Sequence, residues 1–273
     1  MDALSFPLST DCCEFPDRTF PGRAVFSYDC ATCYYSGSFQ YWFSRIMRSD
    51  EIAQLLAPFL ETPLHEMQLR AVSTHLDLLL RWNQRVNLTA VRQPDEIVQR
   101  HFGESFFAAR NLFSAEWRGT VVDLGSGGGF PGVPIAIFAH AAKVTLIESN
   151  GKKAAFLREL TRTLNVANVD VYAGRAEDWL RAPRPERVNV VTLRAVEKFE
   201  NAVPLAVSLL RGSIATPEAP PVERRLALLI GSAQVESAKR LVTGFTWQSA
   251  VPTPGSHNRV VLIGNLSGQE STR

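Results

Sequence analysis

Lysine and cysteine are scarce in most of this sequence. The first lysine is Lys143, so arginine carries almost all of the positive charge. The four cysteines, Cys12, Cys13, Cys30 and Cys33, lie near the N-terminus with no histidine close to them. Adjacent cysteines are poor tetrahedral ligands, so we expect no metal site. The rest of the chain has no thiol, which excludes a cysteine nucleophile there.

Long apolar runs are also missing. No stretch reaches the ~18 residues of a membrane span, and the N-terminus lacks a basic start followed by an apolar run. We therefore expect a cytoplasmic protein with no membrane partner. The net charge of +2 neither favours nor excludes a nucleic-acid partner, because an acidic face can hide a basic one. Either contacts to phosphate and bases or a compositional bias explains the arginine excess.

Three regions differ in their sequence pattern. Residues 1–46 are rich in Ser, Pro, Gly, Cys and aromatic residues without periodicity, which predicts an irregular extension that is disordered or non-native. Residues 47–115 carry apolar side chains at spacings of three and four, which predicts a helical N-terminal segment. One helix is predicted to start at Thr62, just before a proline, and another near Pro94. Residues 116–273 are the predicted core.

From residue 120 the pattern alternates between strands and helices. Such alternation predicts an α/β fold with a mostly parallel, doubly wound, Rossmann-like sheet that has helices on both faces. Ligands of such sheets bind at the carboxyl ends of the strands, where the strand order reverses. The predicted strands are 120–124, 144–147, 169–172, 188–193, 226–230 and 259–263, and the predicted helices are 134–140, 152–164, 177–180 and 201–210.

The first predicted strand runs into a glycine-rich turn. Glycines such as Gly125 and Gly127 let the backbone approach a ligand without a Cβ in the way, and a following helix offers N–H groups to an acidic ligand group. Glu148 closes the second strand, 25 residues after Asp123. A carboxylate at that position can hold two ribose hydroxyls. Asp123 itself either serves the ligand or only caps the turn.

The glycine spacing leaves two cofactor classes open. Gly127, Gly129 and Gly132 satisfy the GxGxxG pattern of dinucleotide enzymes, but prolines flank the last glycine, where a pyrophosphate needs a free helix N-terminus. S-adenosylmethionine needs room for its methionine part, an acid for the ribose and a polar group for the adenine. The segment Gly174–Glu177, after the third strand, supplies that polar group. We therefore favour S-adenosylmethionine over a dinucleotide.

Four blocks of residues, in order between residues 50 and 210, resemble one family. That family is the bacterial RsmG (GidB) methyltransferases. The blocks are Arg81-Trp82-Asn83 through Asn87-Leu88-Thr89-Ala90 with Arg92, Glu96, His101 and Ser105; Asp123 to Pro134; Lys152-Lys153-Ala154-Ala155-Phe156-Leu157; and Arg175-Ala176-Glu177 with Leu193-Arg194-Ala195-Val196.

The resemblance implies a function and a set of site residues. It implies S-adenosylmethionine-dependent methylation of guanine N7 in 16S ribosomal RNA, with that RNA or the small ribosomal subunit as partner. We expect a monomer. Arg92 and His101 would cover the substrate cleft, although a buried, hydrogen-bonded histidine is an equal reading. By the resemblance, the residues that line the cofactor pocket are Gly125, Phe130, Ala176, Glu177 and Arg194, to which the strand pattern adds Glu148.

The implied chemistry needs no general base. Guanine N7 has an in-plane lone pair and no proton, so it can attack the sulfonium methyl group directly. The enzyme then contributes alignment and exclusion of water. Arg194, at the end of the fourth strand, is the predicted catalytic residue, because it can orient the base through O6 or hold a phosphate.

One departure from the family leaves other functions open. Many relatives have a lysine after the strands that end here at Ile230 and Ile263, and this chain has none. Arginines such as Arg224, Arg225 and Arg259 are the predicted replacements on an RNA-facing surface. The alternatives are a methyltransferase of a small molecule or a protein, a dinucleotide-binding oxidoreductase, and an RNA-binding module without catalysis.

Overall fold

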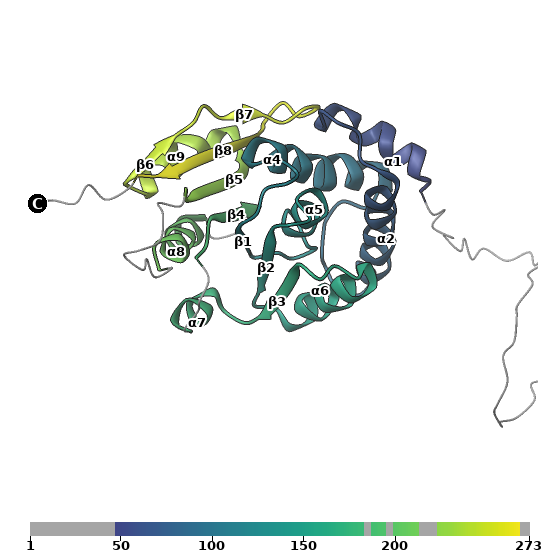
Figure 1. The fold of residues 1–273 in the computed structure, drawn as a ribbon, viewed down its shortest axis with the longest axis horizontal. Helices are drawn as coiled ribbons and strands as arrows, with labels where there is room; N and C mark the ends of the chain where they lie inside the picture. Colours follow the sequence, from purple (N-terminus) through teal and green to yellow (C-terminus); the bar gives the residue numbers. More distant parts are fainter. Residues whose placement is uncertain (1–46, 183–186, 195–198, 213–222, 268–273) are drawn as a thin grey trace, which may run out of the picture. The chain divides into compact units, whose positions relative to one another are not determined.

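The computed structural model describes residues 47–182, 187–194, 199–212 and 223–267 (Figure 1). The predicted irregular extension over 1–46, with all four cysteines, lies outside these residues. The predicted fold class is confirmed: one mostly parallel sheet carries helices on both faces, after an N-terminal group of helices. No helix in the described ranges is both long enough and apolar enough to cross a bilayer.

The strands of the sheet are arranged in the order β3-β2-β1-β4-β5-β8-β6, and β7 pairs with β8. The first five strands along the chain are parallel, whereas β8 runs antiparallel to β5, β6 and β7. The bounds are β1 Thr120–Leu124, β2 Lys143–Glu148, β3 Val169–Ala173, β4 Val190–Arg194, β5 Arg225–Gly231, β6 Phe245–Trp247, β7 Val251–Pro252 and β8 Arg259–Leu266.

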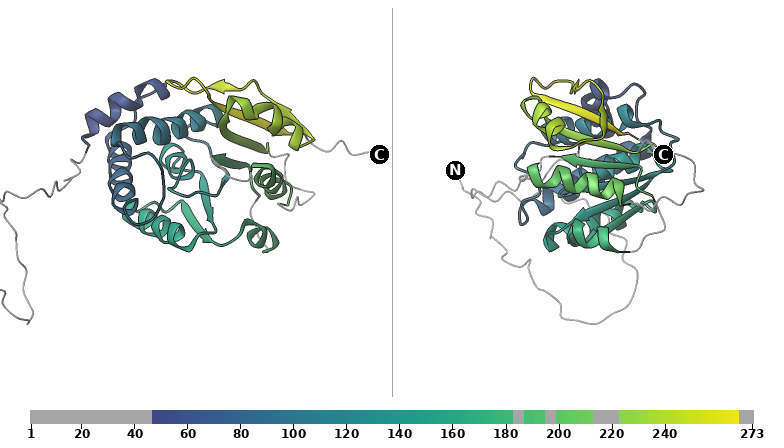
Figure 2. Two further views of the ribbon diagram at one scale, coloured as in Figure 1. Left: turned by 180° about the vertical axis from the view of Figure 1, so that it is seen from behind. Right: turned by 90° about the vertical axis from the view of Figure 1, so that its left-hand side faces the viewer.

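Two groups of helices cover the sheet (Figures 1 and 2). On one face lie α4, α5 and α6, with α1 and α2 packed outside them, and on the other lie α7, α8 and α9. The bounds are α1 Ser49–Leu56, α2 Glu66–Trp82, α3 Pro94–Ile97, α4 Glu104–Leu112, α5 Gly132–Phe138, α6 Gly151–Leu164, α7 Ala176–Arg181, α8 Phe199–Arg211 and α9 Val235–Leu241; short 3₁₀ turns span Ala57–Phe59 and Ser232–Gln234, and a π-helical turn spans Val98–Gly103.

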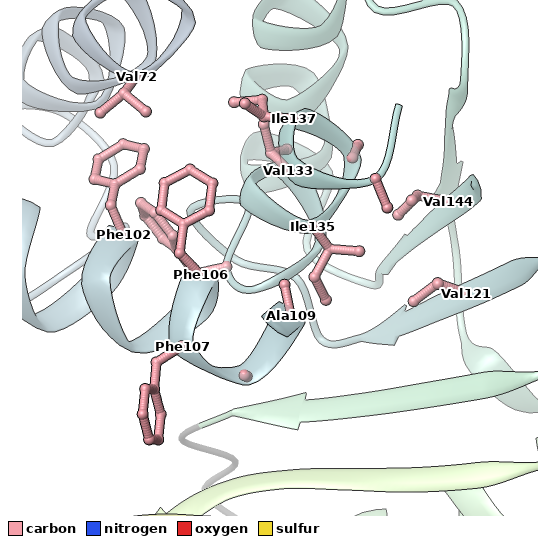
Figure 3. Packing of buried hydrophobic residues seen from close by; sticks show 14 of the residues in the cluster. Val72, Phe102, Phe106, Phe107, Ala109, Val121, Val133, Ile135, Ile137 and Val144 are labelled. Carbon is pink, nitrogen blue, oxygen red and sulfur yellow. The ribbon is translucent and has the colours of Figure 1, made fainter. Parts of the chain in front are cut away.

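Alternate residues of the central strands pack into two separate hydrophobic cores, one on each face of the sheet. Val121 and Val144 belong to the cluster beneath α4, α5 and α6, which also contains Phe106 and Ile135 (Figure 3). Val122, the next residue, belongs to the cluster beneath α8. Successive side chains of a strand face opposite ways, so a strand buried on both faces is apolar at nearly every position. This is why these strands appear as continuous apolar runs in the sequence.

The predicted helix start at Thr62 is wrong. The helix α2 begins at Glu66, and His65 is its N-cap. His65 Nδ1 accepts a hydrogen bond from the Gln68 N–H at 3.4 Å, and Gln68 Oε1 accepts one from the His65 N–H at 3.1 Å. This reciprocal pair needs a glutamine or glutamate three residues after the cap, and Thr62 has none there.

Candidate cofactor and substrate site

The candidate site lies at the carboxyl edge of the parallel strands. From β1 the chain builds β2 and β3 on one side and then returns to place β4 on the other, so the strand order reverses between β1 and β4. Register places Leu124, the end of β1, between Ile147 on β2 and Leu193 on β4. Glu148 and Arg194 each come one residue later, so they flank the loop that starts at Gly125 on its two sides.

The glycine loop has open space in front of its first turn. Gly125 and Gly127 have φ of +75° and +52°, a region that favours glycine. A Cβ built on Gly125 meets no heavy atom within 4 Å, and one on Gly127 meets only the Gly125 carbonyl oxygen at 3.8 Å. A Cβ on Gly132, in contrast, would lie 2.3 Å from the Leu146 side chain. The first two glycines therefore form a cradle that suits a bound cofactor, whereas Gly132 serves packing.

Asp123 holds the end of this loop rather than the open cradle. Its carboxylate is buried and accepts hydrogen bonds from Thr192 Oγ1 at 2.8 Å and from the Gly132 N–H at 3.1 Å. Burial raises the pKa of Asp123 to about 6, against the opposing effect of these hydrogen bonds. The first N–H group of α5 is thus already occupied by a carboxylate.

Glu148 joins the glycine loop to the second strand. Its Oε2 accepts from the Gly127 N–H at 2.9 Å, and its Oε1 accepts from the Asn150 N–H at 2.8 Å. Each carboxylate oxygen has a second lone pair, so the group can still accept from two ribose hydroxyls. The Gly174 N–H donates to the Glu148 carbonyl at 3.0 Å. This main-chain contact brings the turn before α7 next to the end of β2.

The residues predicted to read the adenine differ in exposure. Ala176 is buried and Glu177 is exposed, as the first two residues of α7. A buried alanine followed by an exposed acid at a helix start gives one flat wall and one hydrogen-bonding group. The predicted roles of both residues stay predictions.

Phe130 packs beneath the glycine loop. Its ring stacks on His75 with a centroid distance of 4.8 Å and meets the Phe102 ring edge-on at 4.9 Å. His75 Nε2 lies 2.8 Å from the Gly128 carbonyl oxygen, and burial lowers the pKa of His75 to about 4. His75 is therefore neutral and supports the loop from below. The sequence analysis missed His75, although a histidine within the apolar face of a helix is a signal for such a role.

Arg194 is held by the helical segment that precedes the sheet. Its Nη2 donates to the Arg100 carbonyl at 2.6 Å, lies 2.8 Å from His101 Nδ1 and lies 2.9 Å from Glu104 Oε2. Glu104 is only 5% exposed, and Arg259 Nη2 approaches the same oxygen at 3.3 Å. One buried carboxylate therefore ties β4 and β8 to α4. Sequence analysis did not single out Glu104.

His101 lies in the π-helical turn, a feature that often marks functional sites. It is buried, and its Nε2 lies 2.6 Å from Thr89 Oγ1. Because Arg194 can only donate, Nδ1 accepts and Nε2 carries the proton. Burial, Arg194 and Arg100 lower the pKa of His101 to about 3, so the ring is neutral. This arrangement matches the buried, hydrogen-bonded reading.

Arg92 is exposed and reaches the same network through the main chain. Its Nη1 donates to the Asn83 carbonyl at 3.1 Å, and the Asn83 side-chain amide donates to the Thr89 carbonyl at 2.9 Å. The structure thus brings Arg194 and His101 into contact and connects Arg92 to them only indirectly.

The three arginines that were predicted to replace strand-end lysines do not form a basic surface at the site. Arg224 and Arg225 lie at the start of β5, which is the edge opposite the site, and they donate to the carbonyls of Leu210 and Leu112. Arg259 does reach the site edge, because the antiparallel β8 starts there, but it pairs with Glu104. The direction of each strand decides at which edge of the sheet its arginine lies, and the sequence around the arginines does not reveal that direction.

Comparisons with known proteins identify the family. The model of the family described as "GidB: rRNA small subunit methyltransferase G" matches residues 68–214. The ribosomal RNA small subunit methyltransferase G of Solibacter usitatus is 38% identical over 71% of this chain and 88% of its own length. The protein of the same name from Synechococcus elongatus is 35% identical over 67% of this chain and 82% of its own.

Solved structures support the fold. A putative O-methyltransferase from Klebsiella pneumoniae is similar with a TM-score of 0.52 at 14% identity, over 71% of this chain and 90% of its own. An O-methyltransferase from Bacillus cereus in complex with SAH is similar with a TM-score of 0.50 at 17% identity, over 71% of this chain and 91% of its own. The chain therefore belongs to the rRNA small subunit methyltransferase G (GidB) family and is an S-adenosylmethionine-dependent methyltransferase.

Proposed function

We propose that this protein transfers the methyl group of S-adenosylmethionine to N7 of a guanine in 16S ribosomal RNA. The observation that carries the proposal is the contact between the Gly127 N–H and the Glu148 carboxylate at the point where the strand order reverses. It supports the proposal because an open backbone cradle lies beside a carboxylate that can accept from ribose hydroxyls, in a chain that belongs to an rRNA methyltransferase family.

The cofactor would occupy the β1–β2–β3 side of the edge. Gly125 provides the space for the methionine part, Glu148 accepts from the ribose hydroxyls, and Ala176 with Glu177 flanks the adenine. Phe130 supports the loop from below and contributes a wall. S-adenosylmethionine, when bound, supplies an electrophilic methyl group on a sulfonium.

The substrate side needs no proton acceptor. Guanine N7 carries no proton, so the residues around it have to orient the base and keep water out. His75 and His101 fit this requirement, because their lowered pKa values keep both rings neutral and hydrogen-bonded at neutral pH. They hold backbone and side chains in place and move no proton.

Arg194 is the residue proposed to touch the base. Three acceptors lie within 2.9 Å of its Nη2, so both N–H groups of that nitrogen are engaged, whereas Nη1 forms no hydrogen bond within the described part of the chain. A guanidinium that is fixed at one nitrogen can offer the other to guanine O6 or to a phosphate. His101, through its contact with Arg194, then acts as a positioning residue.

The test is methyl transfer with position mapping. The protein is incubated with labelled S-adenosylmethionine and small-subunit RNA, both naked and in particles, and labelled sites are mapped by reduction and aniline cleavage, which breaks the strand at N7-methylguanine. We expect label at one guanine. If the protein binds S-adenosylhomocysteine but labels neither form of the RNA, the substrate assignment is wrong.

A further inference from the structure

A groove of about 590 Å³ lies between α6 and the C-terminal part of α2 with the residues that follow it. Figure 1 shows these two helices side by side, and they pack on each other. The groove is lined by the cations Arg81, Arg85 and Lys152, by Trp82 and by Glu159. The Arg81-Trp82 and Lys152 blocks, which the sequence analysis singled out, therefore meet at one surface that the proposed mechanism does not use.

The groove carries an excess of positive charge that the described residues leave unpaired. Glu159 is its one carboxylate, and Oε2 of Glu159 accepts from Trp82 Nε1 at 3.2 Å. Arg85 and Lys152 are exposed, and neither forms an ion pair with any residue in the described ranges. Arg81 donates to the main-chain carbonyl of Asp77 at 3.4 Å, and its charge opposes the rise that burial causes in the pKa of the Asp77 carboxyl.

Both walls of the groove are followed or preceded along the chain by residues of the site edge. Lys152 lies in the first turn of α6, shortly after Glu148 closes β2. On its other wall, Asn83 follows Trp82 and holds the loop that presents Thr89 to His101. A strand of nucleic acid that reaches Arg194 can therefore continue along the groove beside the cofactor.

We propose that this groove binds the phosphate backbone of the RNA strand next to the target guanine. The inference rests on the proposed function, because it assigns the course of that substrate. Three cations line the groove, and two of them, Arg85 and Lys152, have no ion-pair partner in the described ranges. Such a row suits several successive phosphates, and the groove is too large for a single small anion. The apolar side chains of Leu78 and Val86 line the same groove and can pack against the sugars between the phosphates.

The test compares two variants with the same loss of charge. Arg85→Ala/Lys152→Ala removes two groove cations. Arg158→Ala/Arg162→Ala is the control, because both arginines are exposed on α6 and neither lines the groove. Methyl transfer and RNA binding are measured over a range of salt concentrations with the full chain, and calorimetry with S-adenosylhomocysteine checks that each variant is folded.

We expect the groove variant to raise the KM for RNA at least tenfold with a much smaller change in kcat. The slope of log K against log salt should become less steep by about 0.7 for each phosphate of a single strand that the variant no longer neutralises. The control variant should change both quantities far less. Equal effects in the two variants would overturn the groove assignment, since bulk charge would then explain them.

A third variant, Glu159→Gln, should act in the opposite direction. It removes the groove's carboxylate while keeping an oxygen that can accept from Trp82, so RNA binding should tighten by about threefold. Weaker or unchanged binding contradicts the proposal. If the unmodified protein neither methylates nor binds the RNA, the proposed function itself fails; if it methylates RNA and the groove variants behave like the control, only the groove inference fails.

Discussion

The two sides of the candidate site are built in different ways. On the β2 side, Glu148 contacts Gly127 and Asn150, which are 21 and 2 residues away in the chain. On the β4 side, Glu104 contacts Arg194 and Arg259, which are 90 and 155 residues away. The first side consists of main-chain N–H groups and one acid within a single βαβ unit. The second consists of buried charges that meet only when the whole domain has folded.

The largest expected effect comes from breaking the β4 side. Glu104→Gln leaves Arg194 and Arg259 together without their carboxylate, and removing one partner of a buried ion pair destabilises proteins by about 3–5 kcal/mol. Urea unfolding at neutral pH measures this loss. The affinity for S-adenosylhomocysteine of the folded variant should stay within about threefold of the unmodified protein, whereas methyl transfer falls strongly. A loss of cofactor affinity equal to the loss of transfer would show that the two sides are not separate.

Breaking the β2 side should have the reverse pattern. Glu148→Ala removes the proposed acceptor of two ribose hydroxyls, and hydrogen bonds to a charged group contribute about 1.5–3 kcal/mol each, so affinity for S-adenosylhomocysteine should fall by at least about 100-fold. Calorimetric titration measures it, and Asp170→Ala, an exposed acid on β3, is the matched control. An affinity unchanged in Glu148→Ala would remove this residue from the cofactor site.

A pH series sharpens the comparison through the buried histidines. The pKa values of His75 and His101 are lowered in the fold to about 4 and 3, so the unfolded chain binds protons first as the pH falls. Above about pH 6.5 both states leave these histidines neutral, and their contribution to the free energy of unfolding is fully present. Below that pH each histidine lowers the free energy of unfolding by about 1.4 kcal/mol per pH unit. Asp123 opposes this, since its raised pKa favours the fold as it protonates between about 6 and 4.

The measurement is the free energy of unfolding between pH 7 and pH 5. It should fall in the unmodified protein, and His101→Gln should remove about half of the histidine contribution while keeping a donor to Thr89. A variant that follows the unmodified curve would show that His101 does not lose its proton on folding.

The smallest expected effects come from alanine substitutions of two glycines in the same loop, and they should differ in kind. Gly125→Ala should weaken S-adenosylhomocysteine binding about tenfold, because the new methyl group enters the open cradle, with about 1 kcal/mol of backbone strain. Gly132→Ala should instead lower the free energy of unfolding by about 1–3 kcal/mol, since its Cβ overlaps Leu146. Calorimetry and urea unfolding on both variants distinguish the two. If Gly132→Ala weakens binding and Gly125→Ala only lowers the free energy of unfolding, the open space at Gly125 is not the cofactor cradle.

The same contrast explains which features could be predicted. The glycine turn and Glu148 lie at the ends of strands that are apolar at nearly every position, so local sequence places them at one edge. Glu104 and His75 lie within apolar helix faces, and their partners come from distant strands whose order no local pattern reveals. The roles of Arg225 and Arg259 depend on the direction of β5 and β8. The short strands β6 and β7 escaped prediction because they have too few residues for a visible period, and the helix α9 was not predicted either.

The capping of α5 by Asp123 has a consequence for selectivity. The first N–H group of α5 already donates to a buried carboxylate, so it cannot also bind the pyrophosphate that the GxGxxG spacing serves in dinucleotide enzymes. We therefore expect NAD to bind far more weakly than S-adenosylhomocysteine, although the glycines of this chain follow the dinucleotide spacing.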